Sequence, residues 1–132
     1  MLNIHSLIST YNKSLPQYKL KTILSGHNQK LSKDYIYSFG IPALKSTSGM
    51  TTCPFAGGCA SFCYAKKGNY ILSNVQKAQE KRLAFTFDPK FVNSVVFEIL
   101  TREIRYLRIH DSGDFYSVSY LLKWAEIATL CP

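Results

Sequence analysis

Apolar and polar residues follow one another in short blocks along the chain, and these blocks predict alternating strands and helices. Residues 35–39, Tyr-Ile-Tyr-Ser-Phe, are rich in β-formers and stop at Gly40-Ile41-Pro42, which predicts a strand that leads into a turn. From Lys45 to Gly58 the chain is dominated by Ser, Thr, Gly and Pro, which predicts a loop. Residues 1–33 show no clear period, and we expect one short helix followed by irregular chain there.

Two helices are predicted in the middle of the chain. Ser73 and Gln76 have the spacing of a capping box, and good helix formers continue to Phe85. Asp88-Pro89 supplies an N-cap carboxylate and a first-turn proline for the second helix. Apolar residues then recur at helical spacing over residues 91–100, which indicates that one face of this helix is buried.

The last third of the chain predicts one more strand and one more helix. Residues 106–109, Tyr-Leu-Arg-Ile, form a short β-rich run that ends at His-Asp-Ser-Gly-Asp in residues 110–114. A final helix is expected from near Ser117 to about Thr129, and its apolar face would carry Leu121, Trp124, Ile127 and Ala128. This order predicts an α/β fold with a short parallel sheet and crossover helices between the strands.

Composition favours one folded domain over residues 1–132. The chain is 46% hydrophobic and 14% aromatic, which argues against disorder, and 132 residues suffice for a single core. No apolar run approaches the roughly 20 residues of a spanning helix, and the first residues lack the apolar stretch of a signal peptide. We therefore expect a cytoplasmic protein without a membrane partner, whose four cysteines are thiols and not a disulfide framework.

The charge is unevenly distributed along the chain. The formal net charge is +8; eleven bases and two acids up to Arg82 give +9, while five bases and six acids after it give −1. Such a cationic part can attract nucleic acid, an acidic protein or an anionic cofactor. The lysines are dispersed and form no block of like charge, so a solvated surface is favoured over a nucleic-acid track.

Three of the cysteines form a cluster in the predicted loop. Cys53, Cys59 and Cys63 have the spacing C-x5-C-x3-C, and this clustering favours metal binding over the alternative that the cysteines merely fill a core. Structural zinc usually takes ligands in two pairs, and no second pair is present here. Three thiolates in one loop suit a 4Fe-4S cluster, in which each thiolate binds a different iron. Gly57 and Gly58 are expected to adopt positive φ and to bring their amides close to the cluster.

The identity of the fourth ligand is left open by the sequence. Cys131 is the remaining cysteine, and closure by Cys131 or the absence of a fourth protein ligand is the first choice. His110 is the second and Asp111 the third, because both follow a predicted strand at its carboxyl end, where ligands collect in α/β folds. The alternative is that residues 110–114 form a turn whose side chains are satisfied by hydrogen bonds. Lys66 and Lys67 would either offset the charge of the cluster or be ordinary solvated surface.

Several short motifs resemble the phage gene product 88 family, over roughly residues 25–132. The motifs that carry the resemblance are Tyr37-Ser38-Phe39, Ile41-Pro42-Ala43, Cys53-Pro54, Gly57, Cys59-Ala60, Phe62-Cys63-Tyr64-Ala65, the run from Arg108 to Tyr116, Tyr120 and Trp124. The resemblance implies a phage protein with a three-cysteine iron-sulfur motif. It also implies a small partial (half) β/α-barrel-like domain, similar to the radical S-adenosylmethionine superfamily.

Together, these features predict a small iron-sulfur protein that binds one 4Fe-4S cluster and transfers electrons at low potential. Its partner would be a redox protein of the host or the phage. A first alternative is a minimal radical S-adenosylmethionine-type enzyme, although that signature is commonly C-x3-C-x2-C and a half-sized barrel leaves little room for a large substrate. A second alternative is a zinc-dependent module that binds nucleic acid or a host protein.

Overall fold

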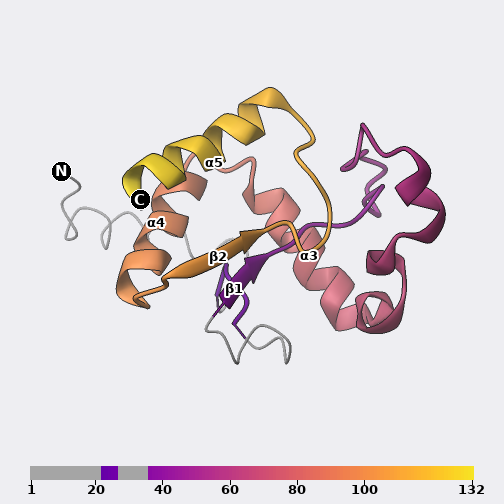
Figure 1. The fold of residues 1–132 in the computed structure, drawn as a ribbon, viewed down its shortest axis with the longest axis horizontal. Helices are drawn as coiled ribbons and strands as arrows, with labels where there is room; N and C mark the ends of the chain where they lie inside the picture. Colours follow the sequence, from indigo (N-terminus) through magenta and orange to yellow (C-terminus); the bar gives the residue numbers. More distant parts are fainter. Residues whose placement is uncertain (1–21, 27–35) are drawn as a thin grey trace.

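The computed structural model describes residues 22–26 and 36–132. These residues form a small mixed α/β domain with a two-stranded parallel sheet and three α-helices (Figure 1). In chain order the elements are β1 (Ile36–Phe39), three 3-10 helices (Gly58–Phe62, Tyr64–Lys66 and Gly68–Ile71), α3 (Ser73–Phe85), α4 (Phe91–Thr101), β2 (Tyr106–Ile109) and α5 (Val118–Leu130). Within the described ranges, none of the helices has the length and apolar character of a membrane span.

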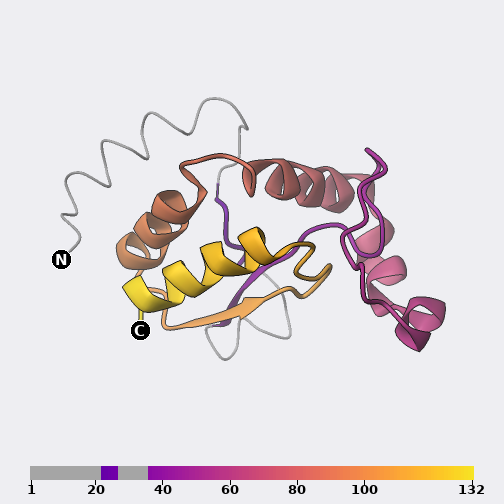
Figure 2. The ribbon, with the colours of Figure 1, turned by 90° about the horizontal axis from the view of Figure 1, so that it is seen from above.

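The two strands pair in parallel, as the sequence predicts. Their register places Ile36 opposite Tyr106 and Phe39 opposite Ile109. The chain between them contains α3 and α4, so the connection is a crossover that returns the chain to the same end of the sheet. Both strands run toward the end of the domain that carries the segment with the three clustered cysteines, while the C-terminal end of α5 lies at the opposite end (Figures 1 and 2).

Aromatic side chains from three elements form the centre of the core. The rings of Phe39 in β1, Phe91 in α4 and Trp124 in α5 contact one another edge to face, with centroids 5.1–5.7 Å apart. All three side chains are buried, and so is Phe85 at the end of α3. The burial of Phe91 and Trp124, which the helical patterns predict, is confirmed. These contacts hold the sheet and the helices together, so that the two strand ends have fixed positions.

A buried carboxylate helps to attach the segment 22–26 to the core. Glu98 of α4 is 3% exposed, and its two oxygens accept hydrogen bonds from the backbone amides of Ile23 (2.8 Å) and Leu24 (3.1 Å). Arg102, one helical turn later, forms an ion pair with Glu98 at 2.6 Å and also donates to the Leu24 carbonyl. The carboxylate is therefore well compensated despite its burial. The predicted short helix in residues 1–33 lies largely outside the described residues.

The predicted helix starts were partly wrong. Ser73 is the first residue of α3 and not its cap; Leu72 occupies the N-cap position, and no side chain caps this helix. Asp88 caps a turn that precedes α4, since its carboxylate accepts from the Lys90 amide at 2.8 Å and the helix starts only at Phe91. Ser117, in contrast, caps α5 as its sequence position predicts.

The buried face of α5 also differs from the prediction. Trp124 and Ile127 are buried, but Leu121 and Ala128 are exposed, and Tyr120 takes the third buried position. Tyr120 fits the core because its hydroxyl meets a ring nitrogen of His110 at 2.7 Å. A hydropathy pattern underestimates the burial of such a tyrosine, since the hydrogen-bond partner of its hydroxyl comes from another element.

Candidate functional site

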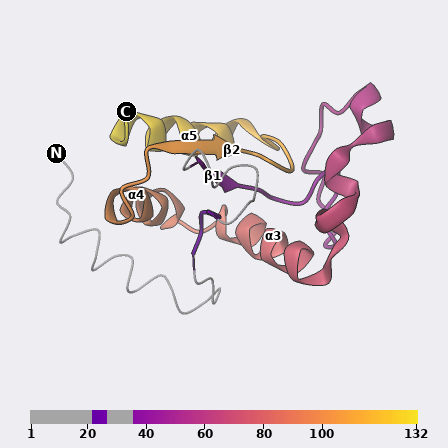
Figure 3. The same cartoon turned by 60° about the horizontal axis from the view of Figure 1, so that its bottom comes forward.

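The cysteine-bearing segment leaves the end of β1 and returns to the domain at α3. Figure 3 shows it as a separate set of turns beside the helices. Cys53 lies in the loop, Cys59 lies in the first 3-10 helix, and Cys63 follows that helix directly. Short 3-10 helices fit this sequence, because Pro54 and the pair Gly57-Gly58 weaken any longer regular helix.

All three thiols line one hollow. Its volume is about 290 Å³, and its opposite wall is residues 111–114, which follow β2. Cys59 is exposed, whereas Cys53 and Cys63 are half-buried. The structure therefore brings the three clustered cysteines to the carboxyl ends of the strands, the place where α/β folds collect their ligands.

Cys53 is held in place by the backbone of Leu44. The Leu44 amide donates to Cys53 Sγ at 3.2 Å, and the Cys53 amide donates back to the Leu44 carbonyl at 3.4 Å. Leu44 adopts a φ of 63°, which is uncommon for a residue with a side chain. This conformation directs the Leu44 N–H group at the sulfur.

Tyr64 connects the cysteine segment to the end of β2. Its hydroxyl donates to the backbone carbonyl of Asp111 and accepts from the guanidinium of Arg108 at 3.1 Å. Its ring also contacts that of Tyr70 edge to face, with centroids 5.8 Å apart. These contacts fix the segment relative to residues 111–114, so the two walls of the hollow are held by a specific bond between them.

The outer rim of the hollow is apolar and open to solvent. Phe55 is 90% exposed and Phe62 is 69% exposed, although both line the hollow. Exposed aromatic rings on one side of a small domain are typical of surfaces that contact another molecule. This rim lies beside Cys59, the most solvent-exposed of the three cysteines.

Gly57 and Gly58 lie next to Cys59, but the prediction of positive φ was wrong. Gly57 has a φ of −102° and Gly58 opens the 3-10 helix, while the glycines with positive φ in the described ranges are Gly49, Gly68 and Gly113. A side chain at Gly57 or Gly58 would meet open space. The approach of the Gly57 and Gly58 amides to a cluster stays a prediction, while the Leu44 amide donates to Cys53 Sγ.

His110 belongs to the aromatic core and does not line the hollow. Its Nε2 lies 2.7 Å from the Tyr120 hydroxyl, and its ring packs edge to face on Phe115 with centroids 4.6 Å apart. Burial lowers the pKa of His110 to about 4, with only a small opposing effect from Asp114. The imidazole is thus neutral and hydrogen-bonded, which is the alternative that the sequence left open for it.

Asp111 does line the hollow, and it also contacts a second one. Its Oδ2 accepts from the Tyr70 hydroxyl at 3.3 Å, while its Oδ1 is buried without a hydrogen-bond partner among the residues that the structure describes. Burial and the negative charge of Asp111 raise the pKa of Tyr70 to about 12. Of the two strand-end residues proposed from the sequence, Asp111 is therefore the one placed beside the cysteines.

Cys131 lies at the other end of the domain. It follows α5, packs against the core, and lines a separate hollow with Ile99, Leu107 and Trp124. Burial raises the pKa of its thiol, which disfavours the thiolate that a metal requires. The structure does not bring Cys131 to the other three cysteines (Figures 1 and 2), so it does not supply the fourth ligand in this arrangement.

No three His, Cys, Asp or Glu side chains of residues 22–26 and 36–132 converge as ligands of one metal ion. The three cysteines surround the hollow without meeting at a point. A single zinc ion needs its ligands about 2.0–2.3 Å from one centre, whereas a 4Fe-4S cluster takes each thiolate on a separate iron. A 4Fe-4S cluster held by Cys53, Cys59 and Cys63 stays a prediction.

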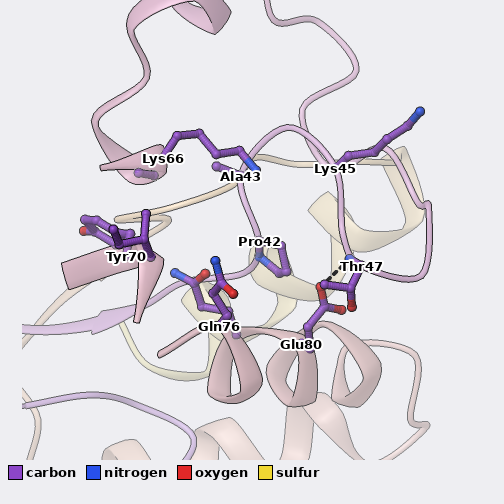
Figure 4. A pocket seen from close by; sticks show the side chains of 11 residues that line it. Pro42, Ala43, Lys45, Thr47, Lys66, Tyr70, Gln76 and Glu80 are labelled. Carbon is purple, nitrogen blue, oxygen red and sulfur yellow. Dashed lines mark hydrogen bonds between the residues drawn. The ribbon is translucent and has the colours of Figure 1, made fainter. Parts of the chain in front are cut away.

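A smaller hollow of about 90 Å³ adjoins the cysteine segment on the side of α3 (Figure 4). The Lys66 side chain extends across it toward Ala43, while Lys45 points away. The Thr47 amide donates to Glu80 of α3 at 2.6 Å, which ties the loop to the helix. Lys66 is therefore directed at this neighbouring hollow and not at the cysteines, and the electrostatic role considered for it from the sequence stays a prediction.

Two residues of the site were not singled out from the sequence. Tyr64 is part of the Phe-Cys-Tyr-Ala motif, but its role depends on Asp111 and Arg108, which lie more than forty positions away in the chain. Arg82 entered only as a charge, although it lines a hollow together with Asp111. The signal that would have pointed to Arg82 is its position on a helix that packs near the ends of both strands.

Comparison with known proteins agrees with the motifs. Residues 13–132 match the gene product 88 family, and since this covers most of the chain, the protein belongs to that family. No curated protein and no solved structure matches the chain.

Proposed function

We propose that this protein binds one 4Fe-4S cluster through Cys53, Cys59 and Cys63 and serves as a small electron-transfer protein. The observation that carries the proposal is that all three thiols line a single hollow of about 290 Å³ at the carboxyl ends of the parallel strands. A cluster bound there would supply one-electron redox chemistry at the surface of the domain. The fold would then be one part of a partial β/α barrel, in which the strand ends form the site.

The surroundings of the thiols support this role. The amide of Leu44 points at Cys53 Sγ, and hydrogen bonds to the sulfurs are one of the means by which proteins set the potential of a cluster. Cys59 is exposed and lies beside Phe55 and Phe62, so an electron would have a short path to a partner. The cationic first part of the chain, Lys66 and Lys67 included, favours a redox partner of the host or the phage with an acidic surface.

The fourth position would have no cysteine ligand in this arrangement. Cys131 is at the far end of the domain, and the wall opposite the cysteines is residues 111–114, with the carboxylates of Asp111 and Asp114. This observation favours a second candidate, a minimal radical S-adenosylmethionine-type enzyme, which needs an open position. One test distinguishes the two candidate functions. Added S-adenosylmethionine should leave the electron paramagnetic resonance spectrum of the cluster unchanged in an electron-transfer protein and should alter it in a radical S-adenosylmethionine-type enzyme.

Single cysteine variants test the proposal, with a matched control in the same chain. Cys53→Ala, Cys59→Ala and Cys63→Ala should each lose most of the iron, because each thiolate would hold a different iron. Cys131→Ala should keep its iron, because Cys131 lines a different hollow. The chain is purified without oxygen, and iron and acid-labile sulfide are measured per chain. Full iron loading in all three loop variants contradicts the proposal; iron loss in Cys131→Ala alone contradicts the assignment of the ligands.

A further inference from the structure

A second hollow lies on the other side of Asp111 from the cysteines. Its volume is about 230 Å³, and it is bounded by the ends of the two strands, by α3 and by Tyr70. Asp111 lines both this hollow and the one with the cysteines, whereas none of the cysteines lines this one. It is far larger than the space of a single water molecule, yet smaller than the roughly 300–1,000 Å³ of drug-sized ligand sites. Its size therefore suits a small metabolite.

The Asp111 carboxylate on its wall has few hydrogen-bond donors among the described residues. Its Oδ1 is buried without a hydrogen-bond partner there, and Oδ2 has only the long bond of 3.3 Å from Tyr70. Gly40 makes this position feasible, since a Cβ at Gly40 would lie 2.2 Å from Asp111 Oδ1. A carboxylate oxygen that is buried without a donor is costly unless a cationic group supplies the missing interaction.

A cation faces the same hollow from α3. Arg82 is half-buried and donates from Nε to the Ile23 carbonyl at 3.0 Å, which fixes its side chain. Its terminal nitrogens make no hydrogen bond to any described residue. Burial lowers the pKa of Arg82, and the negative charges of Asp111 and Glu98 counteract this, so the guanidinium remains protonated.

Arg82 and Asp111 attract each other electrostatically, but they form no ion pair. In the described part of the chain, the one ion pair is that of Arg102 with Glu98. The remainder of the wall is uncharged, and it includes the buried polar side chains of Ser38 and Gln79. The hollow thus presents one positive charge and one negative charge that form no ion pair, together with uncharged polar groups. A ligand complementary to it carries one charge of each sign and no net charge.

We propose that this hollow binds a small zwitterion of the α-amino acid class, whose carboxylate faces Arg82 and whose ammonium group faces Asp111. A guanidinium with unused terminal nitrogens is suited to a carboxylate, which it binds through two parallel bonds. An ammonium group supplies donors to the Asp111 carboxylate. This site does not depend on the cluster, because the cysteines do not line it.

The proposal is tested with three probes of nearly the same size: alanine, propionate, which lacks the ammonium group, and ethylammonium, which lacks the carboxylate. Binding to the full chain is measured by isothermal titration calorimetry. Alanine should bind about 30-fold more tightly than either of the other two, or better, which is the loss expected when one partner of a desolvated charge pair is removed. Equal affinity for the three probes, or no binding of alanine, overturns the proposal.

Variants assign each charge to its group. In Asp111→Asn the preference for alanine over propionate should vanish, and in Arg82→Gln the preference for alanine over ethylammonium should vanish. Gly40→Ala should act as Asp111→Asn does, because its Cβ displaces the carboxylate. Lys81→Gln, on the exposed side of α3, should bind alanine as the unmodified chain does. If Asp111→Asn still prefers alanine over propionate, the assignment of the ammonium group to Asp111 is wrong. If Arg82→Gln still prefers alanine over ethylammonium, the assignment of the carboxylate to Arg82 is wrong.

Iron content, measured on the same samples, separates this site from the cluster. Alanine should bind equally to chain with full iron and to chain from which iron has been removed by a chelator, provided that both are folded by circular dichroism. A chain that contains no iron after purification without oxygen but still binds alanine contradicts the cluster assignment alone. Iron-loaded protein that shows no preference for alanine contradicts this inference alone.

Discussion

Replacement of His110 should change how the stability of the protein depends on pH. The imidazole is buried against Phe115, its Nε2 meets the Tyr120 hydroxyl, and burial holds its pKa at about 4 in place of the ordinary 6.5. Because the folded pKa is lowered, the unfolded chain binds more protons than the folded one between these two values. The folded state therefore loses stability as the pH falls through this window.

The size of the effect follows from the two pKa values. Proton linkage for a shift from 6.5 to about 4 gives a loss of roughly 2.5 kcal/mol between about pH 7 and about pH 4.5. Carboxylates titrate in the same range, so the loss is measured as a difference between the unmodified chain and His110→Asn. Asparagine is the chosen replacement because His110 has a φ of 67°, which Asn tolerates better than most residues.

The assay is urea denaturation at a series of pH values, on preparations of equal iron content. The unmodified chain should lose about 2.5 kcal/mol more than His110→Asn on acidification. His5 and His27 are present in both chains and cancel in the difference. Identical pH profiles for the two chains would refute the reasoning, since they would mean that His110 has the same pKa folded and unfolded.

Three further predictions concern the buried carboxylate, a glycine and the redox properties. Glu98→Ala should lower the free energy of unfolding by about 3–5 kcal/mol, because it leaves two backbone amides and Arg102 without their partner. The control is Glu126→Ala, since Glu126 is exposed. A small loss in both variants would contradict the role of Glu98. Gly113→Ala should destabilise the protein more than Gly49→Ala does. Both glycines have positive φ, but only at Gly113 would a Cβ lie 2.3 Å from a buried side-chain carbon, that of Ile41. Equal losses of stability in urea denaturation would contradict that contact. Voltammetry of the iron-loaded protein should show one low-potential one-electron couple, and an electrochemically silent protein would exclude electron transfer.

Regular elements were predictable where the pattern was local. The strand before Gly40 and the strand at residues 106–109 stand out by their β-formers, and all three helices lie within a few residues of their predicted bounds. Helix starts were less predictable, because Ser73 and Asp88 are both good caps and the surrounding turn decides which residue takes that position.

The site was predictable only as far as it lies in one stretch of sequence. Cys53, Cys59 and Cys63 are close in the chain, and the loop brings them to one hollow. Whether Cys131 joins them depends on where α5 ends, which no local pattern contains. The same holds for Asp111 and Arg82, whose shared hollow depends on how α3 crosses the ends of the strands.

The most direct test of the central claim is the iron and acid-labile sulfide content of the unmodified chain, purified without oxygen. The account predicts four irons and four sulfides per chain, a brown solution and broad visible absorbance. A colourless protein that contains zinc in place of iron, or that contains neither metal, would contradict it, because zinc has a filled d shell and gives no such absorbance.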